Sequence, residues 1–212
     1  MSCTWNPSDI GSSVALSLGN LKWTSSNSGQ VCGRATLGYL ANSGLKLYYE
    51  QTVDVQGSSA QGFEMGVANN SEVLTNYLGA SGNSVCVEAS TGDIFISTGV
   101  GATFTALIAP AGTIIGQYTD FVHSKFWWTV DGITFYGGSG TQNPSTNSGG
   151  FTLANTVFSG GGSTTIYPAF GSRQSGPAGT GNFKGPFAHA VASGFRAWDA
   201  SGGSSSSFFF AA

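Results

Sequence analysis

The chain has 212 residues, a length that one large β-sandwich or barrel can fill without a second domain. Only 8% of the residues are charged and 33 are glycine, a composition that disfavours long surface helices, which usually carry many Glu, Lys, Arg and Gln side chains. The formal net charge of −3, with seven scattered Lys and Arg, argues against the cationic surface that nucleic-acid binding needs.

The opening residues, Met-Ser-Cys-Thr-Trp-Asn-Pro, lack the basic start and apolar core of a secretory signal, and no apolar run reaches membrane-spanning length. We therefore expect a soluble cytoplasmic product without membrane insertion. The three cysteines, Cys3, Cys32 and Cys86, are odd in number and share no metal-binding spacing. We expect reduced, structural thiols, and we predict neither a metal site nor a cofactor.

Short segments of alternating or continuous apolar residues recur along the chain, with turn residues between them. Seven such segments predict an all-β domain, a two-sheet antiparallel β-sandwich. They are residues 47–55, 63–68, 84–88, 93–97, 113–121, 125–130 and 164–170. Asp131-Gly132 follows the sixth segment and predicts a tight hairpin to a strand at 133–136.

Long polar stretches separate these strands, at residues 69–83, 137–150, 160–163 and 172–181. Loops longer than roughly 12 residues are uncommon and are often functional, although each of these stretches can equally be a solvated connection.

The C-terminal residues differ in composition from the rest, so we predict a domain at 1–198 and a tail at 199–212. Residues 201–207 have the Ser/Gly composition of a flexible linker, and Phe208, Phe209 and Phe210 form a short apolar plug behind it. Three exposed phenylalanines are an aggregation hazard, so they either fold back on the domain or dock on another subunit. We expect the tail to mediate self-association into a homo-oligomer or attachment to a larger particle.

Few residues suggest catalysis. Glu50 and Asp54 share one face of a predicted strand, and a glycoside hydrolase needs two carboxylates across a sugar bond, but a solvated strand face explains this spacing as well. His123 and His189 are the only histidines, and no Gly-x-Ser-x-Gly elbow accompanies them. We therefore predict that the chain is not an enzyme.

Several short motifs follow one another in an order that resembles the SPRY domain, a bent β-sandwich related in shape to the concanavalin-like jelly rolls. Residues near both ends, 4–9, 182–187 and 194–198, are similar to those of bacterial and bacteriophage members. The motifs are 47–50 (Leu-Tyr-Tyr-Glu), 65–68 (Met-Gly-Val-Ala), 77–79 (Tyr-Leu-Gly), 114–116 (Ile-Ile-Gly), 126–132 (Phe-Trp-Trp-Thr-Val-Asp-Gly) and 166–169 (Ile-Tyr-Pro-Ala).

This resemblance implies a ligand surface built from inter-strand loops at one rim of the sandwich, here the loop 69–83 and the turn after residue 170. The candidate contacts on that basis are Asn70, Glu72, Asn76, Tyr77, Arg173 and Gln174. An aromatic ring with amides and a guanidinium suits a sugar or a peptide backbone, although Tyr77 can instead pack beneath its own loop. We expect Tyr77→Ala and Arg173→Ala to weaken binding with little change in melting temperature.

Together these features predict a non-catalytic binding or structural module. The leading hypothesis is a bacteriophage or phage-like virion component (tail, fibre, spike or capsid decoration) that contacts other virion subunits and binds a cell-surface glycan or protein ligand through rim loops. One alternative is a lectin-like glycoside hydrolase that uses Glu50 and Asp54. Another is an intracellular protein-interaction adaptor, which the Gly-Ser-Thr-rich composition disfavours.

Overall fold

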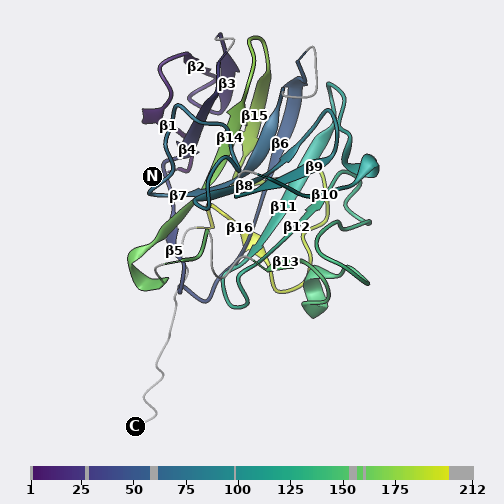
Figure 1. Ribbon diagram of the computed structural model, residues 1–212. Coiled ribbons are helices and arrows are strands. Elements are labelled where there is room, and N and C mark those ends of the chain that lie inside the picture. Colours follow the sequence, from purple (N-terminus) through teal and green to yellow (C-terminus); the bar gives the residue numbers. More distant parts are fainter. Residues whose placement is uncertain are drawn as a thin grey trace.

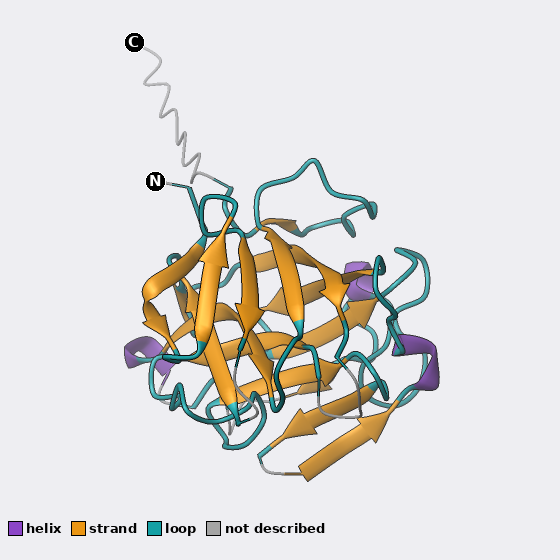
Figure 2. Cartoon of the chain, turned by 90° about the horizontal axis from the view of Figure 1, so that it is seen from above, coloured by secondary structure: helices purple, strands orange, loops and turns teal. Residues whose placement is uncertain are grey.

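The computed structural model describes residues 2–26, 29–57, 62–97, 99–152, 157–159 and 161–200. These residues form two eight-stranded sheets packed face to face, and almost every strand pairing is antiparallel (Figure 1). The view from above shows the two layers, with short helical turns only at the periphery (Figure 2). The prediction of an all-β sandwich is confirmed.

Sheet A contains the strands in the following order, with β5 (Tyr39–Leu40) pairing β14 off the main path: β1 (Trp5–Ile10), β4 (Val31–Ala35), β14 (Thr165–Ser172), β7 (Glu64–Asn69), β8 (Ser84–Glu88), β9 (Asp93–Ile96) and β10 (Gly99–Thr103).

Sheet B has a parallel strand, β16 (Arg196–Ala197), beside β6, and its other strands run in this order: β13 (Phe151–Thr152), β12 (Lys125–Thr129), β11 (Ile114–Asp120), β6 (Lys46–Val55), β15 (Ala178–Asn182), β3 (Lys22–Ser25) and β2 (Val14–Ser17). Three 3-10 turns complete the described elements: η1 (Thr105–Leu107), η2 (Pro144–Thr146) and η3 (Gly161–Ser163).

The main core lies between the sheets and is rich in aromatic rings. Trp23 of sheet B stacks on Phe170 of sheet A with ring centroids 4.5 Å apart, and Trp5 meets Phe170 edge-on at 4.9 Å. Rings packed in these geometries contribute attraction beyond their buried area. Side chains of β6 alternate between the two faces of sheet B, and Leu47 and Tyr49 are among those that point into this core.

All seven predicted strands are present with small shifts at their ends, but nine of the sixteen described strands were missed, among them β15 in the middle of sheet B. All but the last residue of β15 falls within the stretch 172–181 that the sequence predicts as a loop, and the strand pairs with both β3 and β6. Its glycines explain the error, because a Cβ at Gly179 would lie 2.3 Å from the ring of Phe63. Glycine lets large rings approach the strand backbone, and it also removes the apolar alternation that marks a strand.

The predicted hairpin after β12 is also wrong. Residues 133–136 form no strand, and only Tyr136 pairs, exchanging backbone hydrogen bonds with Trp128. The carboxylate of Asp131 instead accepts hydrogen bonds from the backbone N–H groups of Ile133 and Thr134. This side-chain cap holds the chain in a wide turn in place of the two-residue turn.

Both sheets carry a second layer on their outer faces. On sheet B, Tyr48, Tyr118 and Trp127 form an aromatic cluster that the C-terminal segment 183–198 covers through Phe195. On sheet A, a smaller apolar cluster lies beneath the loop that connects β7 and β8.

The cysteines are free and buried, in agreement with the expected structural thiols. Burial raises the pKa of Cys3 to about 12 and that of Cys86 well above its ordinary value, so both thiols are unreactive at neutral pH.

Candidate functional site

The loop 70–83, which the resemblance assigns to ligand contact, lies across the outer face of sheet A. Leu74 and Leu78 pack there against Cys86 and Ala169. The loop therefore covers part of the sheet, whereas a free rim loop would project into solvent.

An arginine fixes the start of this loop. Nη1 of Arg34 donates hydrogen bonds to the carbonyls of Asn69 and Glu72, at 2.6 and 3.1 Å. Its Nε and Nη2 each lie 2.7 Å from an oxygen of Asp9. This bidentate pair leaves the guanidinium little freedom and anchors the loop to β4.

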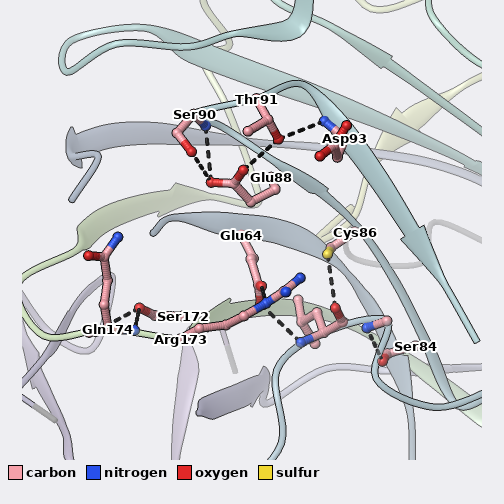
Figure 3. A network of polar contacts seen from close by, with 12 residues as sticks. Glu64, Ser84, Cys86, Glu88, Ser90, Thr91, Asp93, Ser172, Arg173 and Gln174 are labelled. Atoms are coloured by element: carbon pink, nitrogen blue, oxygen red, sulfur yellow. Dashed lines mark hydrogen bonds and ion pairs between the residues drawn. The ribbon is translucent and has the colours of Figure 1, made fainter. Parts of the chain in front are cut away.

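Tyr77 and Arg173, two of the six predicted contacts, do come together. The Arg173 guanidinium carbon lies 3.6 Å from the centroid of the Tyr77 ring and 4.1 Å from that of Phe95. Nε of Arg173 donates to Oε1 of Glu64 at 2.9 Å, with side chains that are 12% and 0% exposed (Figure 3). The arginine thus joins the β14–β15 turn to the loop and to a buried carboxylate.

Glu64 is a buried partner of Arg173 that the sequence analysis missed, because strand alternation predicts a solvated side chain at this position. Burial raises the pKa of Glu64, whereas Arg173 and the backbone N–H of Leu78, 3.0 Å from Oε2, act to lower it. Glu88 lies directly opposite on β8 and raises the Glu64 pKa further. Arg173 is therefore the main group that opposes the rise in the Glu64 pKa.

Glu88 is itself buried and fully engaged (Figure 3). It accepts hydrogen bonds from the hydroxyls of Ser90 and Thr91 and from the backbone N–H of Ser90. Glu64 and Glu88 therefore organise the local turns rather than lining a cleft.

The other loop candidates are separated from this cluster. Asn70 is exposed and accepts a hydrogen bond from the backbone of Thr165, at the opposite end of β14. Glu72 is buried and accepts from the hydroxyl of Ser81. Asn76 is half-buried. The structure thus groups Tyr77 with Arg173 and does not bring Asn70 or Glu72 to them.

Gln174 is half-buried and lies on the other side of the β14–β15 turn. A Cβ placed on Gly57 would lie 2.6 Å from its side-chain nitrogen, so the amide packs closely against the end of β6. The structure has a cavity at this end of β6 that the sequence did not predict.

A cavity of about 550 Å³ opens at this end of the sandwich. It lies where β6 ends and β15 begins, since Val55 pairs with Ala178. Its lining consists of Asp54, Val55, Gln56, Gly57, Ala111, Ser175 and Gly176. The turn residues at 56–57 and 175–176 were visible in the sequence, but only the sheet register brings them together.

The walls of this rim cavity are held in place by polar contacts. The Gln56 amide donates to the carbonyls of Ala89 and Ala109, at 2.9 and 3.1 Å. Asp54 lies 3.2 Å from Nζ of Lys22. Val55 is 46% exposed, so the cavity offers an apolar wall beside preorganised polar groups.

The expected solvated face with Glu50 and Asp54 is wrong for Glu50, which is 2% exposed. Its carboxylate accepts hydrogen bonds from the Tyr48 hydroxyl and from the backbone N–H groups of Ala188 and His189. Four residues along a strand place the two acids roughly 13 Å apart. Glycosidase carboxylates lie about 5–9.5 Å apart, so this pair does not match the hydrolase alternative.

The histidines make structural contacts. His123 Nδ1 lies 2.9 Å from Asp120, and His189 Nε2 lies 3.0 Å from the carbonyl of Ile114. Within the described ranges, no group of three His, Cys, Asp or Glu residues is placed to hold a metal ion. No helix in that part of the chain is long and apolar enough to cross a membrane.

Comparison with known proteins places this architecture among SPRY-like sandwiches. No family model and no curated protein matches the chain. Among solved structures, the SPRY domain of human HERC1 matches with a TM-score of 0.59 and 13% identity, over 84% of this chain and 96% of that one.

Two further structures match in the same way. The TRIM65 PSpry domain has a TM-score of 0.55 and 12% identity, over 85% of this chain and 91% of that domain. A human SPRY domain has a TM-score of 0.53 and 16% identity, over 82% and 98%. The fold defined by these matches is that of a SPRY-type β-sandwich, as the motif order suggested.

Proposed function

We propose that the chain is a non-catalytic interaction module that binds a protein partner at the rim cavity between the end of β6 and the β14–β15 turn. The observation that carries the proposal is the cavity of about 550 Å³, which combines an exposed apolar wall with fixed polar groups. Binding sites are typically concave, mostly apolar and supplied with a few well-placed polar groups. The SPRY domains among the structural neighbours support this class of function by analogy of fold.

The cavity suits an extended peptide better than the Tyr77–Arg173 cluster does. One face of the Tyr77 ring already lies against a guanidinium, whereas Val55 and Ser175 are exposed. A cell-surface glycan is the other ligand that the polar groups Asp54 and Gln56 can serve, through hydrogen bonds to hydroxyls.

Selection from a random peptide library and a glycan array, both with the purified chain, test this proposal. Ser175→Arg places a long cationic side chain at the mouth of the cavity, and we expect it to weaken binding of the selected ligand at least tenfold. Ser71→Arg is the matched control, because Ser71 is also exposed but lies at the opposite end of β14. Equal binding by both variants would place the site elsewhere.

We further propose that the module is a bacteriophage or phage-like virion component, located in the virion and in contact with other virion subunits. The low charge content and the similarity of both chain ends to bacteriophage members support this role. Mass spectrometry of purified particles should detect the chain at a fixed stoichiometry. Its presence only in the host cytoplasm would favour the adaptor alternative.

A further inference from the structure

Two adjoining hollows flank the N-terminus on the side of the sandwich where the described chain ends. One, of about 390 Å³, is lined by Ser2, Thr4, Thr36 and Leu37. The other, of about 270 Å³, shares Ser2 and is lined further by Cys3, Leu21, Gly181, Asn182, Phe183, Lys184 and Gly185. A cavity of roughly 150 Å³ holds a benzene ring, so each hollow has room for an aromatic side chain.

The chain leaves the domain at the boundary between these hollows. Nε1 of Trp198 donates to the carbonyl of Leu37, in the wall of the first hollow. The backbone N–H of Asp199 donates to the carbonyl of Phe183, in the wall of the second. The Asp199 carboxylate in turn accepts hydrogen bonds from the Ser2 hydroxyl and the Cys3 N–H, at 2.9 and 2.8 Å.

The residues that follow this exit lie outside the described part of the chain, and they include Phe208, Phe209 and Phe210. Seven residues, 201–207, separate them from Ala200 and can span at most about 25 Å. That reach is ample for hollows whose walls are hydrogen-bonded to Trp198 and Asp199. Three consecutive phenylalanines in water are an aggregation hazard, and burying their rings is favourable.

We propose that the Phe208–Phe210 segment docks into the two hollows of its own chain. A short linker gives the segment a millimolar effective concentration at these hollows. At micromolar protein concentration, its own chain therefore outcompetes a neighbouring copy. Attachment to a particle requires the segment to leave the hollows, so this docked state competes with the assembly role predicted for the tail. The inference does not depend on the rim cavity.

Limited proteolysis of the full chain with chymotrypsin, which cleaves after phenylalanine, tests the docking. Ser2→Trp fills the wall shared by both hollows, and we expect cleavage after residues 208–210 to be at least tenfold faster in this variant at 1 µM protein. Lys184→Trp fills the second hollow from an exposed position and should also accelerate cleavage. Ser175→Trp, at the rim cavity, is the matched control and should cleave like the unchanged chain.

Light scattering at the same concentrations identifies which chain holds the segment. The proposal predicts protection of the tail in the monomer. Equal cleavage rates in all four proteins would overturn the docking, and protection that appears only together with a dimeric mass would show that a neighbouring copy holds the segment. Peptide binding at the rim cavity should be unaffected by Ser2→Trp in every case, which separates this test from that of the proposed function.

Discussion

Replacing Arg173 by alanine should destabilise the domain strongly, contrary to the expectation from the sequence that it leaves the melting temperature unchanged. Arg173 is the cation that pairs with Glu64, and their side chains are 12% and 0% exposed. Breaking a buried ion pair from one side costs about 3–5 kcal/mol. For a domain of this size, such a loss corresponds to a fall of roughly 6–20 °C in melting temperature.

The effect of Arg173→Ala should also depend on pH. Without the guanidinium, burial raises the pKa of Glu64 further above its ordinary value of 4.5. A group whose pKa is raised on folding contributes stability that is present below the unfolded pKa and is lost as the pH rises. With Arg173 in place, burial raises the pKa of Glu64 to about 8, so folded Glu64 is protonated in both proteins between pH 5 and pH 7 and the loss should be the same at these two values. Above pH 8 only the variant keeps Glu64 protonated, and the loss should grow by about 1.36 kcal/mol per pH unit.

Urea unfolding at pH 7 and pH 9 measures both quantities. Glu64→Gln combined with Arg173→Ala should be more stable at pH 7 than Arg173→Ala alone, because the buried carboxylate is gone. Arg196→Ala is a control from an exposed position and should stay within about 0.5 kcal/mol of the unchanged chain. A loss for Arg173→Ala below 0.5 kcal/mol, or one of equal size at both pH values, would refute this account of the pair.

Three further substitutions probe other parts of the structure. Tyr77→Ala should cost only about 0.5–2 kcal/mol in urea unfolding, the range of a cation–π contact, and a loss above 4 kcal/mol would show that the ring supports more of the loop. Gly179→Ala should cost about 1–3 kcal/mol because its Cβ meets the Phe63 ring, whereas Gly82→Ala, with its nearest neighbour at 3.7 Å, should be nearly neutral; similar melting of both would contradict the packing of β15. Glu50→Ala leaves two backbone N–H groups unpaired and should accelerate amide exchange in segment 183–198 at least tenfold, and unchanged exchange there would show that the carboxylate does not hold it.

The strands could be predicted from the sequence wherever apolar residues alternate. Residues 84–88 match β8 at both ends, and the other six predicted strands differ from the observed ones by one or two residues at one or both ends. β15 could not be predicted, because the rings of Phe63 and Trp23 that pack over Gly179 come from distant parts of the chain.

The candidate site was less predictable than the fold. Glu64 and Glu50 lie on outward-facing strand positions, and they are buried only because a loop and the C-terminal segment cover the two sheets. That Tyr77 and Arg173 lie on one surface could be predicted only from the family resemblance. The rim cavity is formed by strand ends far apart in the sequence, so only the register of β6 with β15 reveals it.

The most direct test of the interaction module is hydrogen–deuterium exchange of the chain with and without a peptide selected from the library. The account predicts protection at residues 54–57 and 174–177 and near Ala111, the segments that surround the rim cavity. Protection confined to the loop 70–83, with unchanged exchange around the cavity, would contradict the account. It would indicate that the ligand binds at the Tyr77–Arg173 cluster.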